Sequence, residues 1–231
     1  MKAILGKKIE MSQIFDENGR VTPVTKVLVE SLVVTQVKNK EKDGYQAIQL
    51  GLGEKKKNKK KKEGTPKSAR DFRHLREFRI DDIANFQKGQ EIKLNIFEPQ
   101  ELVSVQGMSK GKGFQGVVRR HHFHGAPASH GTKDQLRMPG SAGPTFPQHV
   151  IKGRRGPGRM GYEKVTVKNL EVIKIDEENK IIYLKGATPG VRQSLLLIIG
   201  EGIKKKNTVE EEALSEGKEK KPAKAQAAKK K

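Results

Sequence analysis

The feature that most constrains this chain is a stretch of 57 residues, 107–163, that has no hydrophobic periodicity of its own. It contains 12 of the 24 glycines, five of the ten prolines and ten Lys or Arg residues, against only Asp134 and Glu163. A loop of this length without secondary-structure signals is rare in a compact domain and is usually functional or disordered. The sequence therefore predicts a folded body that carries one long, extended, basic loop.

Strand signals lie on both sides of this stretch. The runs RVTPVTKVLVE and LVVTQVK come before it, and KVTVKNLEVIKI, IIYLKGA and SLLLIIG come after it. Runs rich in Val, Ile and Thr that are bounded by Gly, Asn and Asp are typical of strands joined by turns. We therefore expect a mainly β body formed by residues 1–106 and 164–202.

Two further segments differ from this β pattern. Residues 55–100 are expected to form a small α/β insertion, with a Lys-rich loop at Lys55–Lys62, a short basic helix in SARDFRHLREF and a strand in QEIKLNIF. Residues 203–231 are highly charged and poor in apolar side chains, which predicts a disordered, low-complexity tail. A run of lysines is typical either of a solvated loop or of an arm that binds phosphates.

The net charge of +21 and the pI of about 10.0 indicate the class of partner. Such an excess of positive charge repels itself unless a polyanion offsets it, so nucleic acid is the first partner to consider and an anionic membrane surface the second. No apolar run is long enough to span a bilayer, and the first residues lack the pattern of a secretory signal. The absence of Cys excludes disulfides and Cys-ligated zinc. We expect a cytoplasmic protein.

The segment GKGFQG, Gly111–Gly116, matches the spacing of a dinucleotide-binding turn. That motif also requires a helix of ten or more residues immediately afterwards, and only eight residues separate Gly116 from the next GAP. The alternative is that Gly111, Gly113 and Gly116 let the backbone approach a phosphate chain closely. Both interpretations remain open here, a nucleotide-dependent enzyme and a protein that binds a larger polyanion.

The basic side chains favour the second interpretation. Lys110, Lys112, Arg119 and Arg120 surround the glycines, and KGRRGPGRMG at Lys152–Gly161 repeats the same composition. Cations interleaved with glycines suit phosphate contacts, and Phe114 either stacks on a base or anchors the loop. His121 and His122 are expected to stack on bases or bind phosphates. A metal site is disfavoured by the neighbouring cations.

Several long motifs resemble one known family. They are ILGKKIEMSQIF, VTQVKNKEKDGYQAIQLGLG, SKGKGFQGVVRRHHF, ASHGTKDQLRMPGSAG and RMGYEKVTVKNLEVIKID, followed by LLLIIG. Together they are similar to the bacterial form of protein three of the large ribosomal subunit, from about Ile4 to Ile199. The Lys-rich loop and the tail fall outside this resemblance.

The resemblance implies a translation-factor-like β-barrel whose long loop enters 23S ribosomal RNA toward the peptidyl transferase centre. It implies neighbouring large-subunit proteins as further partners, a role in subunit assembly, and no catalytic activity, cofactor or small-molecule substrate. A general DNA-binding basic protein is a third alternative. The RNA contacts carried over by position are Lys110, Lys112, Arg119, Arg120, His130, Arg137, Lys152, Arg154, Arg155 and Arg159.

Two positions depart from the family pattern. Glu10 stands where the opening motif usually has Gly, so we expect a different local turn there. Some members carry a methylated glutamine at the loop tip, and Gln148 is the candidate here. It lies in a shifted register after Pro147, which weakens the transfer of that modification.

Overall fold

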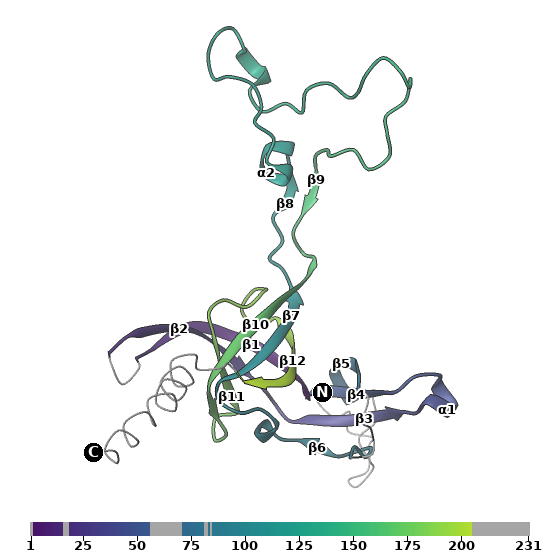
Figure 1. Ribbon diagram of the computed structural model, residues 1–231, viewed down its shortest axis with the longest axis vertical. Helices are drawn as coiled ribbons and strands as arrows, with labels where there is room; N and C mark the ends of the chain where they lie inside the picture. The colour runs from purple at the N-terminus through teal and green to yellow at the C-terminus, as the bar shows by residue number, and fades with distance from the viewer. Residues whose placement is uncertain (1, 16–18, 56–70, 81–82, 84, 205–231) are drawn as a thin grey trace, which may run out of the picture.

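The computed structural model describes residues 2–15, 19–55, 71–80, 83 and 85–204. These residues form a body that contains two β-sheets, from which one long arm projects (Figure 1). The arm comprises residues 109–163. The body and the arm are therefore distinct parts of one chain.

The described elements are mostly strands, which confirms the prediction of a mainly β protein. In chain order they are β1 (Lys2–Phe15), β2 (Val21–Leu28), β3 (Leu32–Lys38), α1 (Lys40–Asp43), β4 (Ala47–Glu54), β5 (Phe72–Arg79), β6 (Glu91–Ile92), a 3-10 turn (Leu94–Ile96), β7 (Glu101–Met108), β8 (Gly113–Gln115), α2 (Val117–His121), a 3-10 turn (Lys133–Gln135), β9 (Gly158–Met160), β10 (Lys164–Asp176), β11 (Ile181–Lys185) and β12 (Leu195–Lys204).

Six strands close into a barrel in the order β1-β12-β7-β10-β11-β2, and all neighbours are antiparallel. Strand β1 is long enough to pair twice. Its first half pairs with β12 and its second half with β2, with a bulge between Lys8 and Glu10. A bulge bends a strand and increases its twist, which suits a strand that turns a barrel corner. Glu10, where a different turn was expected, lies at this bulge.

The barrel interior is filled by alternate residues of its strands. Leu196 and Ile198 of β12 and Ile182 and Leu184 of β11 are fully buried. Side chains point to opposite faces at successive strand positions, so each of these pairs lies on the inner face. Full burial of one such aliphatic side chain stabilises the folded state by about 1.5–3 kcal/mol.

The second sheet has the order β5-β4-β3-β6 and lies beside the barrel (Figure 1). Its buried side chains, among them Leu50, Leu52 and Phe78, belong to the same hydrophobic cluster as those of the barrel. Gly51 is covered by the Phe72 ring, whose nearest atom lies 2.6 Å from where a Cβ would stand. The two sheets thus share one core.

The structure differs from the sequence expectations around this sheet. The expected helix in residues 68–78 is wrong where it is described, because Phe72–Arg79 forms β5 and pairs along its length with β4. Pairing with a neighbouring strand overrides a local helix preference. In QEIKLNIF, only Glu91–Ile92 is a strand, and a 3-10 turn follows. Strands β3 and β4, expected to be part of the barrel, belong to the second sheet.

Two of the predicted segments lie mostly outside the described residues. Residues 56–62 of the Lys-rich loop are outside, while the Lys55 backbone N–H donates a hydrogen bond to the Asp71 carbonyl at 2.7 Å. Residues 205–231 of the expected tail are also outside, and β12 continues to Lys204.

Candidate nucleic-acid interface

The arm begins as a continuation of the barrel. Met108 of β7 is paired with Lys164 of β10, and beyond this pair the Ser109 N–H donates to the Glu163 carbonyl at 2.8 Å. Further out, β8 and β9 form a short antiparallel ladder. The two chain segments therefore run together as a stem, which holds the rest of the arm away from the barrel (Figure 1).

Gly161 is needed for the two sides of the stem to meet. Its φ is +75°, and a Cβ at this position would collide with the Lys110 carbonyl oxygen and lie 3.1 Å from the Gly111 Cα. Both the left-handed backbone and the close approach exclude a larger side chain.

The motif GKGFQG lies on one side of this stem. Gly113 begins β8 with φ +71°, and Gly116 precedes α2, which has only five residues. No atom lies within 4 Å of where a Cβ would stand on Gly113 or Gly116, so this face of the backbone is open. The preceding strand β7 has antiparallel neighbours on both sides. A dinucleotide turn instead requires a parallel strand–helix–strand unit.

The outer part of the arm, residues 116–157, is called the head here, and it is held by a few polar contacts. The Arg120 guanidinium donates to the Gly156 carbonyl at 2.9 Å and packs on Gly158, which joins α2 to the returning chain. Arg154 donates to the Ser141 carbonyl at 2.7 Å. Arg120 is half-buried, so it has a structural contact in addition to its predicted role at RNA.

Arg120→Lys is expected to loosen the head without changing its charge. The substitution removes the planar fork that reaches Gly156, and a hydrogen bond from a charged donor that is partly exposed is worth about 1 kcal/mol. Amide exchange around residues 154–158 should therefore become about fivefold faster. Arg119→Lys is the matched control, because Arg119 is exposed and donates only to Gln115 within the described chain. Equal exchange in the two variants would contradict this role.

The arm has almost no hydrophobic core. All of residues 109–163 are described, and among them Val117 is the one apolar side chain that is buried. Five large apolar side chains of the head are exposed: Leu136, Met138, Phe146, Val150 and Ile151. Burial of apolar surface is the main favourable term in folding. Burial of apolar side chains within the arm therefore contributes little to the stability of the head.

The second notable feature of the arm is its charge. Within the described ranges, none of its ten Lys and Arg side chains forms an ion pair with an acidic residue. Most of the predicted contact residues are exposed, namely Lys110, Lys112, Phe114, Arg119, His122, His130, Arg137, Lys152, Arg154, Arg155 and Arg159, while Arg120 and His121 are half-buried. Unpaired cations along an extended arm suit a chain of phosphates.

The fold brings some predicted residues together and leaves others apart. Phe114 and Arg159 face each other across the β8–β9 ladder. His121, His122 and Arg155 line one shallow hollow in the head. The remaining predicted residues of the head, with the exposed Gln148, are spread along its loops.

Tyr162 was not among the residues predicted from the sequence. Tyr162 is 63% exposed, and the Arg159 guanidinium lies 5.9 Å from the centroid of its ring. A guanidinium next to an exposed aromatic ring is a surface on which nucleic-acid bases stack. The signal was present in the sequence, since this tyrosine directly follows the second basic cluster.

Lys8 lies at the base of the arm and was not predicted either. Its ammonium is buried and donates to the carbonyls of Thr188 and Gly190 at 2.7 and 3.3 Å, which fixes the loop between β11 and β12. Burial lowers the pKa of Lys8, and the positive charge of Lys110 lowers it further. A phosphate beside Lys110 would relieve this repulsion.

The described part of the chain offers neither a metal site nor a membrane-spanning helix. No group of three His, Cys, Asp or Glu residues there is placed to hold a metal ion. None of the described helices has the length and apolar character needed to cross a membrane.

The described residues combine a mainly β body with an extended arm whose cations form no ion pair with a described acidic residue, an arrangement suited to binding a polyanion. Comparison with known proteins then names a family. Residues 77–181 match the family model of ribosomal protein L3. The chain is 48% identical to large ribosomal subunit protein uL3 of Carboxydothermus hydrogenoformans, over 89% of this chain and 99% of the relative. It is 45% identical to that of Finegoldia magna, over 89% and 100% of the two chains.

The chain belongs to the ribosomal protein L3 family. This confirms the resemblance drawn from the motifs. Members of this family are structural ribosomal proteins and not enzymes, so the nucleotide-dependent enzyme is excluded as an alternative.

Proposed function

We propose that this protein is a structural constituent of the large ribosomal subunit that binds 23S ribosomal RNA directly through its arm. The observation that carries the proposal is the arm itself, with ten cations, no ion pair to a described acidic residue and one buried apolar side chain. The names of the relatives support the ribosomal location. The protein then works in the cytoplasm, on the ribosome.

In the proposed mechanism the barrel and the arm have different roles. The barrel, which we infer to be of the translation-factor kind, rests on the subunit surface beside neighbouring proteins. The arm enters the RNA, supports the peptidyl transferase centre and holds RNA helices together during assembly. Fixing the backbone costs about 1–2 kcal/mol per residue, which phosphate and stacking contacts must offset. The head is therefore expected to become ordered as it binds.

Neutralising three arm cations should lower the salt dependence of RNA binding. Lys112→Gln/Lys152→Gln/Arg155→Gln removes three exposed charges that make no side-chain hydrogen bond in the described chain. Removal of each phosphate contact reduces the slope of log affinity against log salt by about one. The slope should fall by about three, measured by filter binding of the purified chain to 23S rRNA fragments.

The matched control removes three exposed lysines of the body, as Lys88→Gln/Lys93→Gln/Lys180→Gln. This variant has the same net charge and should keep most of the original slope. Equal slopes for the two variants would mean that the arm is not the RNA-binding surface. Equal affinity of the unmodified chain for duplex DNA and folded rRNA would favour the general DNA-binding alternative.

A further inference from the structure

The outward face of β12 is more apolar than is usual for a strand face that is exposed to water. Leu196 and Ile198 point into the barrel, so Leu195, Leu197 and Ile199 point outward, and all three are half-buried. Antiparallel strands with one face in water normally alternate apolar and polar residues. An outward face with three aliphatic side chains in a row indicates a surface that is covered when the protein is at work.

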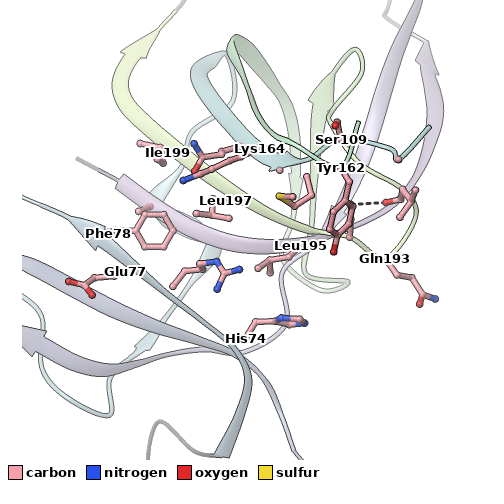
Figure 2. Close-up of a pocket in the computed structure, with 18 of the residues that line it drawn as sticks. His74, Glu77, Phe78, Ser109, Tyr162, Lys164, Gln193, Leu195, Leu197 and Ile199 are labelled. Atoms are coloured by element: carbon pink, nitrogen blue, oxygen red, sulfur yellow. Dashed lines mark hydrogen bonds between the residues drawn. The ribbon is translucent and has the colours of Figure 1, made fainter. Parts of the chain in front are cut away.

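This face forms the floor of a groove between the barrel and the second sheet. The groove has a volume of about 930 Å³ and is partly open to solvent. Figure 2 shows Leu195, Leu197 and Ile199 on the barrel side of the groove and Phe78 and His74 of β5 on the other. The wall formed by β5 is an edge strand of the second sheet.

The rim of the groove is positively charged. Three cationic side chains line it, Arg76, Arg79 and Lys164, together with the imidazole of His74. The single carboxylate among the lining residues is Glu77, which forms an ion pair with Lys38 at 3.0 Å. Burial lowers the pKa of His74, and the charges of Lys7, Arg76 and Arg73 lower it further, against a raising effect from Glu30.

We propose that this groove binds a segment of another large-subunit protein that carries aliphatic side chains flanked by carboxylates. The aliphatic floor is complementary to aliphatic side chains, and the cationic rim is complementary to Asp and Glu. This inference rests on the proposed function, because it needs the chain to be part of the subunit. It adds a protein-binding site at the base of the arm, where Gly111 and Tyr162 line the groove, separate from the head.

Two other occupants fit the groove less well. RNA bases stack on aromatic rings, whereas the floor consists of Leu and Ile side chains, and Tyr162, the one exposed ring among the lining residues, belongs to the arm. A second copy of this chain would bring a further +21 charges, and like charges at an interface oppose association.

A photo-crosslinking residue in place of Leu197 tests the proposal in the intact subunit. The full chain is expressed in its host with p-benzoylphenylalanine at this position, and large subunits are isolated on a sucrose gradient before and after irradiation. We expect a crosslink to a peptide of another ribosomal protein that contains Leu, Ile or Val next to Asp or Glu. The matched control places the same crosslinker at Val21, which is 53% exposed on β2 and does not line the groove.

The outcomes separate this inference from the proposed function. Absence of the chain from the large-subunit fraction would contradict the proposed function. Presence of the chain with a crosslink to rRNA, to its own residues 205–231, to a second copy or to nothing would overturn the groove as a protein-binding site.

Charge reversal on the rim gives a second test, which leaves the aliphatic floor of the groove unchanged. Arg76→Glu should lower the crosslink yield about tenfold, because it places a carboxylate against those of the partner. Arg73 lies on the same strand, is exposed and does not line the groove, so Arg73→Glu should leave the yield unchanged.

Addition of a synthetic peptide of the crosslinked sequence to the purified chain should raise the pKa of His74, measured by NMR. Equal yields for the two variants, or an unchanged pKa of His74, would contradict the proposal.

Discussion

Replacing residues 116–157 with a two-residue Asn-Gly turn is expected to abolish tight rRNA binding and to leave the body folded. Gln115 and Gly158 are opposite each other at the end of the β8–β9 ladder, so a two-residue turn joins them. The deletion removes seven of the ten arm cations: Arg119, Arg120, Lys133, Arg137, Lys152, Arg154 and Arg155.

The decrease in affinity should be large because electrostatic contacts dominate binding to a phosphate backbone. Removing about seven phosphate contacts is expected to weaken binding to 23S rRNA fragments on the order of a thousandfold at physiological salt. The body should keep its stability, since the hydrophobic cluster contains no residue of the arm. Filter binding measures the first effect and thermal unfolding followed by circular dichroism the second.

The control for this deletion is the unmodified chain at several salt concentrations. If the shortened chain binds rRNA with the original affinity, the head is not the interface. A fall in the unfolding temperature of more than about 10 °C, a shift that corresponds to well over 1 kcal/mol, would show that the arm stabilises the body.

Ile198→Ala is expected to cause the largest decrease in stability among single substitutions on β12. Ile198 is fully buried in the barrel and is paired with Ile4 of β1 and Val105 of β7, so the alanine leaves a cavity among packed side chains. Truncation of a buried Ile to Ala costs about 2–5 kcal/mol in the free energy of unfolding. Urea denaturation of the purified chain measures this change.

Ile199→Ala is the matched control, with the same substitution one position along the strand. Its side chain is half-buried on the outward face, so the free energy of unfolding of the isolated chain should fall by no more than about 1 kcal/mol. A similar cost for both substitutions would mean that β12 does not present alternate residues to the barrel interior.

Much of this architecture follows from local sequence. The Val- and Thr-rich runs predicted the strands correctly, because the alternation of buried and exposed positions along a strand is visible in the residue types of neighbouring positions. The length and composition of residues 107–163 predicted a basic extension, since neither the glycines nor the unpaired cations can form a core. The failure of GKGFQG as a dinucleotide turn was also predictable, and α2 is indeed only five residues long.

Other features could not be predicted because they depend on contacts distant in sequence. Phe72–Arg79 has a composition compatible with a helix, and only its pairing with β4 makes it a strand. The stem ladder joins β8 to β9 across 42 intervening residues, and no local signal specifies that register. Lys8 resembles an ordinary surface lysine in the sequence, yet the loop at Thr188 and Gly190 buries it.

By itself, the sequence determined the strand-rich body, the net charge of +21 and the position of the basic arm. These properties depend on residue types and short-range periodicity, which are present in the unfolded chain. Only the tertiary structure decided which strands close the barrel, that Arg120 joins α2 to the returning chain at Gly156 and that β12 and β5 line an apolar groove. Each of these depends on long-range pairing, which fixes the face of every side chain only once the chain has folded.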